Sequence, residues 1–183
     1  MGSAISNSVG GMSRQQAWHR YVARLLAVLT VVTFVAVRHV VAGESEGGQK
    51  LPRFVSLRSD QINLRVGPGE NYPIEWVLTR KEMPVEIVKE FENWRMIRDW
   101  QGTEGWVHER MLTGKRAVVI RGGIRTLHRL PDPASPAVAR AQPGVVARLL
   151  ECRGDWCRID AADHAGWVQR GDLWGVYPDE VVQ

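Results

Sequence analysis

The chain of 183 residues contains 24 Lys and Arg, 20 Asp and Glu and a hydrophobic fraction of 44%, which is enough for one or two small globular domains. Its positive excess comes from residues 1–42, which contain four Arg and no acidic residue. Removing those four from 24 leaves 20 basic residues against 20 acidic ones, so the rest of the chain is neutral. No surface for nucleic acid or another polyanion is therefore expected.

Residues 1–42 have the three parts of a signal peptide. A positively charged region precedes an apolar run of 13 residues, 25–37, and Val40-Val41-Ala42 places small residues before a cleavage point at Gly43. The run is shorter than the ~20 residues needed to cross a bilayer. The alternative is an uncleaved anchor, which would confine membrane contact to residues 20–42. Both interpretations predict an extracytoplasmic protein, either periplasmic or secreted.

Beyond this leader, one sequence unit occurs twice. In each copy, a turn and a strand that begins with Trp are followed by a second strand with the sequence Gly-Trp-Val. The matching segments are Asn93-Trp94-Arg95 with Gly105-Trp106-Val107, and Asp155-Trp156-Cys157 with Gly166-Trp167-Val168. Before these segments, the copies align at a constant offset of 63 residues. Each copy has ~60 residues, about the size of the smallest domains that fold alone.

The repeat defines the expected domain organisation. Residues 43–52 are rich in Gly and Glu and are predicted to form a flexible tether. The first domain is expected at residues 53–115, and the second at residues 116–183, which include a C-terminal tail. Because no linker separates the copies at Gly114-Lys115-Arg116, we expect the two domains to pack against each other.

The first copy alternates apolar and polar residues with the two-residue period of half-buried strands. The alternating sets are Val55/Leu57, Ile62/Leu64/Val66, Ile74/Trp76/Leu78 and Val85/Ile87, followed by strands at 94–98 and 105–107. Turn-forming residues separate them, and no window of ten or more residues shows a helical stripe. The sequence therefore predicts an all-β fold, with five to six short antiparallel strands in each of two tandem small barrels.

The turns of the first copy carry motifs that resemble a known family. They are Asn63-Leu64-Arg65-Val66-Gly67-Pro68-Gly69, Tyr72-Pro73, Asn93-Trp94 and Gly102-Thr103-Glu104-Gly105-Trp106-Val107. In this order they are similar to the bacterial SH3-like (SH3b) domain. The second copy resembles it less, because Thr126 to Pro131 replace the opening motif. The resemblance implies a five- to six-stranded barrel used for binding outside the cytoplasm, often to cell-wall peptides, and often appended to enzymes.

The two cysteines flank a predicted hairpin turn. Gly154-Asp155 is a favoured two-residue turn, and placing it there sets Cys152 directly opposite Cys157. In an oxidising compartment such a pair can form a disulfide. The competing interpretation is redox or metal chemistry, but Cys-x4-Cys lacks the two-residue spacing of redox motifs, and a zinc site would need two further ligands, of which His164 is the nearest candidate.

The repeat alignment places Glu90 and Arg95 at the positions of the two cysteines in the first copy. Opposite charges at directly opposed positions of two strands form a weakly stabilising pair. We therefore predict that one hairpin is joined covalently and the other by an ion pair.

Aromatic residues are the main candidates for a binding site. Tyr72, Trp76, Trp94 and Trp100 border the loops where SH3-like folds carry their peptide groove, and aromatic rings bind extended peptides with large contact area and little entropic cost. The alternative is that aromatic residues only fill the core or its rim, which we favour for Trp106 and Trp167.

Candidates for catalysis are few. Cys157 could be paired with His128 or His164 as nucleophile and base, but nothing in the pattern orients such a base. We therefore expect no enzymatic activity, no metal and no cofactor.

Two functions remain. The first is an exported, non-enzymatic module that binds a cell-wall peptide or an envelope protein. The second is a structural or assembly subunit whose groove is filled by its own second domain or by its tail, Leu173 to Gln183, which carries several apolar residues.

Overall fold

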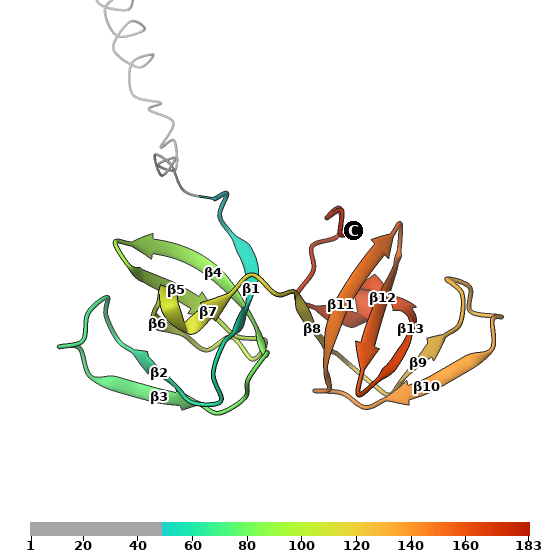
Figure 1. Ribbon diagram of the computed structural model, residues 1–183, viewed down its shortest axis with the longest axis horizontal. Coiled ribbons are helices and arrows are strands. Elements are labelled where there is room, and N and C mark those ends of the chain that lie inside the picture. Colours follow the sequence, from blue (N-terminus) through green and yellow to red (C-terminus); the bar gives the residue numbers. More distant parts are fainter. Residues whose placement is uncertain (1–48) are drawn as a thin grey trace, which may run out of the picture. The chain divides into compact units, whose positions relative to one another are not determined.

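The computed structural model describes residues 49–183 (Figure 1). The predicted signal peptide at 1–42 and most of the predicted tether lie outside these residues. Among residues 49–183, no helix has the length and apolarity needed to span a membrane. The same residues contain no α-helix, and their helical structure is limited to two single turns of 3-10 helix, so the prediction of an all-β fold is confirmed.

The first set of strands, barrel 1, begins at Arg53. Its elements are β1 (Arg53–Leu57), β2 (Ile62–Arg65), β3 (Ile74–Leu78), β4 (Pro84–Phe91), β5 (Trp94–Arg98), β6 (Glu104–His108), the 3-10 turn η1 (Glu109–Met111) and β7 (Leu112–Thr113). These strands form one antiparallel sheet in the order β3-β2-β6-β5-β4-β1-β7. Short turns connect β4 to β5 and β5 to β6, so these three strands form two consecutive hairpins.

The second set of strands, barrel 2, repeats this plan. Its elements are β8 (Ala117–Ile120), β9 (Arg125–His128), β10 (Ala137–Ala141), β11 (Val146–Arg153), β12 (Trp156–Ala161), β13 (His164–Gln169), η2 (Arg170–Asp172) and β14 (Leu173–Trp174). The order β10-β9-β13-β12-β11-β8-β14 matches barrel 1 strand for strand. The predicted boundary between residues 115 and 116 falls between β7 and β8.

Irregularities in the sheets repeat as well. The register between β4 and β5 shifts between Ile87 and Lys89, and the register between β11 and β12 shifts at the aligned residues Leu149 and Glu151. A bulge makes one strand bend and twist more strongly, which a sheet needs in order to curl into a barrel. The two copies therefore bend their sheets at the same point.

The glycine of each Gly-Trp-Val segment allows two strands to approach closely. A Cβ atom on Gly105 would lie 2.5 Å from the side chain of Leu64 on β2. A Cβ atom on Gly166 would lie 2.8 Å from Cβ of Leu127 on β9, with the carbonyl oxygen of His128 at 3.2 Å. Glycine is required here because β6 and β13 lie close against these leucines of the neighbouring strands β2 and β9.

Each barrel has its own apolar core. The buried residues of barrel 1 are Leu57, Ile62, Leu64, Leu78, Val85, Ile87, Ile97, Val107 and Leu112. In barrel 2, two of the aligned positions hold smaller residues, Ala141 and Ala147, and the C-terminal tail contributes Val176 and the partly buried Val182. The backbone N–H of Cys152 also donates to the carbonyl of Val182 at 3.0 Å. The tail thus completes the core of its own barrel.

Two features differ from the sequence-based expectation. Each barrel has seven strands rather than five or six, because the two-residue strands β7 and β14 pair with β1 and β8. The alternation at Ile74, Trp76 and Leu78 predicts one buried face, but only Leu78 is buried, and Ile74 and Trp76 are about half exposed at 47% and 58%. The reason is that β3 is the edge strand of its sheet.

Aromatic rings join the two barrels, as expected from the missing linker. Phe54 of β1 packs against Trp174 at 5.0 Å and against Tyr177 at 4.6 Å between ring centroids. The hydroxyl of Tyr177 donates to Oε1 of Glu86 on β4 at 2.7 Å. Burial and this hydrogen bond raise the pKa of Tyr177 above its ordinary value.

The tail is anchored by an ion pair at Glu180. Its carboxylate accepts hydrogen bonds from the guanidinium of Arg116 and from the backbone N–H of Tyr177. Burial acts to raise the pKa of Glu180, but these hydrogen bonds outweigh it and hold the pKa below its ordinary value. The tail reaches barrel 1 at Phe54 and Glu86, on β1 and β4.

Candidate functional site

The predicted hairpin chemistry is present in both barrels. Cys152 on β11 and Cys157 on β12 are directly opposed and form a disulfide. In barrel 1, Glu90 and Arg95 are directly opposed in the same way, with Nε of Arg95 at 3.2 Å from Oε1 of Glu90. One hairpin is therefore joined covalently and the other by an ion pair, as the alignment predicts.

The ion pair of barrel 1 belongs to a larger network that the sequence did not reveal. Arg53 of β1 contacts the same Glu90 oxygen at 2.6 Å, and Arg95 also contacts Glu109 of η1 at 2.5 Å. The network therefore joins β1, β4, β5 and η1, whereas the disulfide joins only β11 and β12. Arg116, which aligns with Arg53, contacts Glu180 of the tail instead.

The long loop between β2 and β3 is held by residues of the opening motif. The Arg65 guanidinium donates to the carbonyl of Tyr72 at 2.6 Å, which ties the two ends of the loop together. The ring of Tyr72 lies over Gly67, where an added Cβ would come within 2.3 Å of it. This part of the motif therefore shapes the loop.

In barrel 2, His128 replaces Arg65 and performs the same task. Its Nδ1 lies 2.8 Å from the carbonyl of Ser135, the residue that aligns with Tyr72. Because a carbonyl oxygen only accepts hydrogen bonds, Nδ1 carries the proton. The ring of His128 also meets the ring of Trp156 edge-on at 5.8 Å. The divergent opening of the second copy thus keeps the loop closed by other means.

The four aromatic residues predicted as a groove lie in separate parts of barrel 1. Tyr72 and Trp76 belong to the β2–β3 loop and to edge strand β3, and they are 46% and 58% exposed. Trp94 is half-buried at the start of β5, and its ring meets that of His108 edge-on at 5.5 Å. Trp100 is half-buried in the turn after the other end of β5. Trp94 and Trp100 therefore cannot contact the same part of a small ligand.

Barrel 2 contains a hollow beside Trp156, which we call the Trp156 groove. Its first part has a volume of about 250 Å³ and lies between β9, the β9–β10 loop, the start of β12 and the end of β13. The polar and aromatic residues that line it include Arg125, Thr126, His128, Trp156, Gln169 and Asp172. Arg125 and Asp172 pair with each other at 3.1 Å, so few charges remain for a ligand.

A second hollow of about 530 Å³ adjoins the first at Trp156. Trp156 and Gln169 line both hollows, and the second is completed by Arg121, Arg170 and residues of the tail. The Arg170 guanidinium donates to the carbonyls of Tyr177, Pro178 and Glu180, so it holds the tail in place. Two hollows that share one aromatic residue form a geometry that suits an extended chain.

Sequence reasoning missed the Trp156 groove, although the repeat points to it. Trp156 aligns with Trp94, which was predicted as a ligand contact, and the aligned lining positions of barrel 1 include Asn63, Arg65 and His108. The histidine that meets the tryptophan comes from β6 in barrel 1 and from β9 in barrel 2. Alignment alone could not show this exchange, because it depends on neighbours across the sheet.

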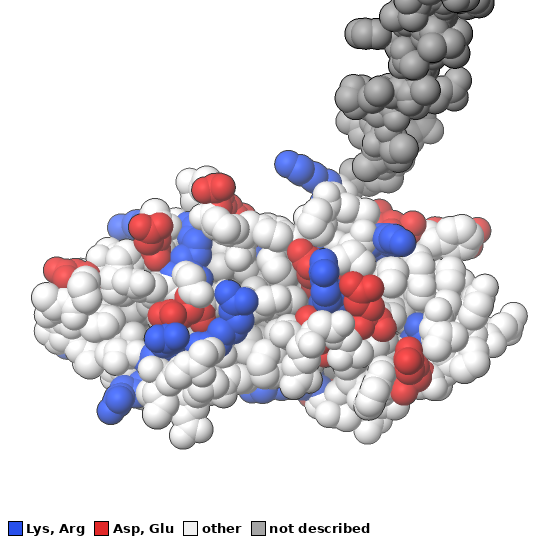
Figure 2. All heavy atoms as spheres, turned by 180° about the vertical axis from the view of Figure 1, so that it is seen from behind, with Lys and Arg blue, Asp and Glu red and all other residues white. Residues whose placement is uncertain are grey.

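Charges of both signs are mixed on one face of the molecule. Figure 2 shows Lys and Arg interspersed with Asp and Glu on the face it presents, with no large area of one sign. Within residues 49–183, no group of three or more His, Cys, Asp or Glu side chains is arranged to hold a metal ion. The Trp156 groove itself combines aromatic and uncharged polar groups with charged side chains of both signs.

Comparison with solved structures finds proteins of low sequence identity. NlpC2 from Trichomonas vaginalis is 11% identical with a TM-score of 0.33, over 73% of this chain and 51% of that one. NlpC1 from the same organism is 13% identical with a TM-score of 0.31, over 74% and 49%. An NlpC/P60 family protein from Bacillus cereus ATCC 10987 is 12% identical with a TM-score of 0.30, over 66% and 55%. The chain thus spans about half the length of these proteins.

Comparison with curated proteins finds no match. Comparison with protein families finds the bacterial SH3 domain twice, at residues 58–114 and 124–175. These segments cover β2–β7 and β9–β14, so each match covers one barrel apart from its first strand. The chain belongs to the bacterial SH3 domain family and carries two tandem copies of that domain.

Proposed function

We propose that this protein is an extracytoplasmic, non-enzymatic module that binds a cell-wall peptide through the grooves of its two barrels. The family match supports a binding role for the barrels. The Cys152–Cys157 disulfide supports an oxidising compartment, because disulfides persist outside the cytoplasm and are rare within it. The observation that carries the proposal is that Trp156 lines two adjoining hollows.

The chemistry of the Trp156 groove fits a peptide backbone. Thr126, His128 and Gln169 supply hydrogen-bonding groups beside the aromatic ring, which matches the alternating N–H and C=O groups of an extended chain. A rigid ring contributes a large contact area and loses little conformational entropy on binding. Because Arg125 and Asp172 neutralise each other, the groove does not require a strongly charged ligand.

Barrel 1 is proposed to bind through the aligned position, Trp94. Its ring is half-buried, and His108 supports it from β6. Tyr72 and Trp76 are proposed to extend this surface along the β2–β3 hairpin, and Trp100 to bind separately at the far end of β5. Two similar sites on one chain would raise the avidity for a polymer such as the cell wall.

Sedimentation with purified cell-wall sacculi tests the proposal. The wild-type protein is compared with Trp156→Ala, Trp94→Ala, the double variant and Trp76→Ala, which removes the exposed ring proposed to extend the surface beside Trp94. Each groove variant is expected to lower the bound fraction, and the double variant is expected to weaken binding by about tenfold or more, as the loss of a central aromatic contact does. Circular dichroism confirms that each variant is folded.

Three outcomes would change the proposal. Unaltered sedimentation of the double variant would exclude both grooves as the binding sites. Loss of binding in Trp76→Ala alone would move the site to the edge strand β3. No sedimentation of the wild-type protein, together with specific capture of an envelope protein that Trp156→Ala abolishes, would assign the grooves to a protein partner.

A structural or assembly role is the second candidate, and one observation favours it. Trp174 and Tyr177 of the tail pack against Phe54 of barrel 1, so one surface of barrel 1 is already covered by its own chain. That surface lies on β1 and β4, away from the start of β5 where Trp94 lies. Normal binding of the Tyr177→Ala variant to sacculi would show that the contact between the tail and barrel 1 is not required for ligand binding.

A further inference from the structure

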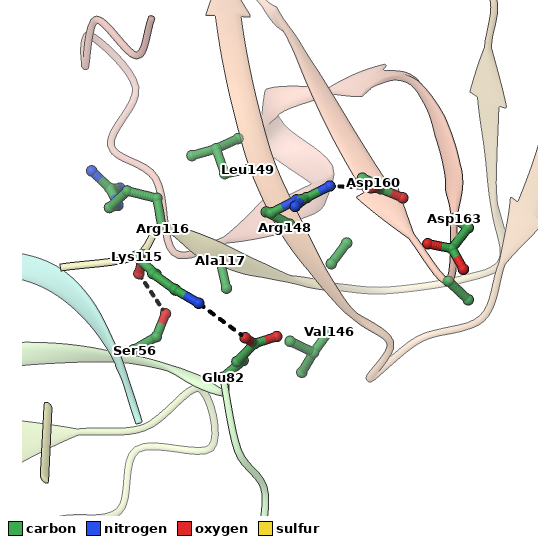
Figure 3. Close-up of a pocket in the computed structure, with 12 residues that line it drawn as sticks. Ser56, Glu82, Lys115, Arg116, Ala117, Val146, Arg148, Leu149, Asp160 and Asp163 are labelled. Atoms are coloured by element: carbon green, nitrogen blue, oxygen red, sulfur yellow. Dashed lines mark hydrogen bonds and ion pairs between the residues drawn. The ribbon is translucent and has the colours of Figure 1, made fainter. Parts of the chain in front are cut away.

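A second pocket lies where the two barrels meet, and it shares no residue with the Trp156 groove. Its volume is about 490 Å³. Barrel 2 provides most of the wall through β8, β11 and the β12–β13 turn, and barrel 1 adds Ser56 and Glu82. Figure 3 shows these side chains around the open space between the barrels. We call it the inter-barrel pocket.

Charged groups of both signs line this pocket beside a small apolar surface. Lys115 of the connecting segment is directed towards Glu82 at 3.8 Å, and Arg148 of β11 contacts Asp160 of β12 at 2.5 Å (Figure 3). The Lys115 and Arg148 side chains remain 74% and 67% exposed, so both can contact a ligand. Val146, Ala147 and Ala162 form the apolar part of the lining.

The carboxylates of the pocket have unused hydrogen-bonding capacity. Oδ2 of Asp160 contacts Arg148, but its other oxygen, Oδ1, is buried and has no hydrogen-bond partner among residues 49–183. Such atoms are uncommon in folded proteins, since a buried acceptor without a donor costs stability. Within the same residues, Asp163 forms no ion pair. The pocket therefore offers the exposed carboxylate of Asp163 to a cationic donor.

The backbone around the pocket is held in an unfavourable conformation. Four non-glycine residues among those described have positive φ, and three of them line this pocket, namely Glu82 at 62°, Ala162 at 50° and Asp163 at 64°. A residue with a Cβ is disfavoured in this region. Ala162 and Asp163 are the two central residues of the β12–β13 hairpin turn, and a tight two-residue turn of this kind requires positive φ at both positions.

We propose that the inter-barrel pocket binds a small zwitterion, an amino acid or dipeptide that carries a free ammonium group and a free carboxylate. The ammonium group is bound by Asp163, and the carboxylate by Lys115 and Arg148. The small side chains of such a ligand contact Val146 and Ala162. The pocket volume falls within the range of small-molecule sites.

Binding is tested by NMR titration of the 15N-labelled protein with four probes: alanine, Ala-Ala, N-acetyl-Ala-Ala and Ala-Ala-amide. Affinities of about 1 mM are expected for a ligand of this size. Alanine or Ala-Ala should shift the amide signals of Ala147, Ala162 and Asp163. Blocking either terminus should weaken binding by about tenfold, because it removes a charge-assisted contact. Which of the two unblocked probes binds more tightly identifies the ligand length.

Paired variants assign the two charges. Asp163→Asn should weaken the binding of Ala-Ala about tenfold but leave the binding of N-acetyl-Ala-Ala, which lacks the ammonium group, unchanged. Lys115→Gln should likewise weaken the binding of Ala-Ala but leave that of Ala-Ala-amide, which lacks the carboxylate, unchanged. Asn tolerates positive φ, so the first variant keeps the turn. Asp60→Asn and Lys89→Gln are exposed controls that should change nothing.

Equal binding of blocked and unblocked probes would overturn the proposal, and so would signal shifts confined to the Trp156 groove or no shifts at about 20 mM probe. The sacculus experiment depends on Trp94 and Trp156, so its result is independent of this one.

Discussion

Barrel 1 and barrel 2 have the same strand order and the same bulge between their fourth and fifth strands, but they hold equivalent contacts together with different chemistry. Glu90 and Arg95 form an ion pair where barrel 2 has a disulfide. On the same two strands, further from the turn, Glu86 pairs with Arg98 in barrel 1, and Arg148 pairs with Asp160 at the aligned positions in barrel 2. The signs of the charges are reversed, and the contact is retained.

The comparison shows which features of the repeat can be exchanged. A contact between directly opposed residues depends on strand geometry, so a disulfide or either polarity of ion pair can provide it. The loop carbonyl is likewise held by Arg65 in one barrel and by His128 in the other. In contrast, both barrels retain glycine at the aligned positions 105 and 166, because a Cβ atom there would come too close to a leucine of the neighbouring strand.

The largest effect is expected at those glycines. Gly166→Ala should lower the free energy of unfolding by about 3 kcal/mol and Gly105→Ala by about 1 kcal/mol, because overpacking costs more where the neighbours are rigid. The new Cβ meets Cβ of Leu127 and backbone atoms in barrel 2, but only the outer side-chain atoms of Leu64, from Cγ onwards, in barrel 1. Urea denaturation measures both, and equal losses would contradict this difference between the barrels.

The next effect separates the two hairpins. Reducing the Cys152–Cys157 disulfide should lower stability by about 2 kcal/mol, the value expected for a short loop. Hydrogen exchange should show the loss in barrel 2 while barrel 1 keeps its protection. Uniform loss over both barrels would mean that the disulfide stabilises more than its own domain.

Glu90→Gln is the matching change in barrel 1 and should lower the free energy of unfolding by about 2 kcal/mol, because it leaves two partly buried arginines, Arg53 and Arg95, without their shared partner.

The double variant Glu90→Cys/Arg95→Cys sharpens the comparison. Since these residues are directly opposed as Cys152 and Cys157 are, it should form a second disulfide in air, which thiol titration detects as four oxidised cysteines. Two persistent free thiols would contradict the equivalence of the hairpins.

Tyr177→Phe should cost about 1 kcal/mol, the net value of one hydrogen bond, through loss of the contact with Glu86. The pKa of Tyr177 is raised above the ordinary 10.0, so the fold favours the neutral phenol. Its contribution is complete below pH 10 and is lost as the pH rises further. Stability measured from pH 9 upwards should therefore decline more steeply in the wild type than in the Phe variant, and parallel curves would contradict the contact.

Glu180 is expected to have the smallest effect, and it acts at the opposite end of the pH scale. The pKa of Glu180 is lowered from the ordinary 4.5, so its ion pair with Arg116 contributes fully above pH 4.5 and is lost as the pH falls below that value. Glu180→Gln should remove this part of the acid dependence. A Gln variant with the same acid transition as the wild type would show that the tail is held by other contacts.

Sequence predicted what depends on local geometry. The register of a two-residue turn decides which residues are opposed, so the disulfide and the Glu90–Arg95 pair followed from the turn and the repeat alone. The strands of both barrels followed from the two-residue alternation and the alignment. The burial of Trp76 was not correctly predicted, because alternation cannot tell an edge strand from a central one.

Features that depend on packing between distant segments were not predictable. Arg53 joins the Glu90 network only because β1 lies beside β4, and the tail completes the core of barrel 2 because alanines at 141 and 147 leave room. The groove beside Trp156 arises from the meeting of β9, β12 and β13 with a loop. Such arrangements depend on the closure of the barrel and are not contained in any short segment.

The central claim is that a cell-wall peptide occupies the groove beside Trp156 and the aligned surface beside Trp94. Amide chemical-shift mapping with soluble cell-wall fragments tests it most directly. The account predicts shifts at Thr126, Trp156 and Gln169 together with shifts at Asn63 and Trp94. Shifts confined to edge strand β3, or none in either barrel, would contradict it.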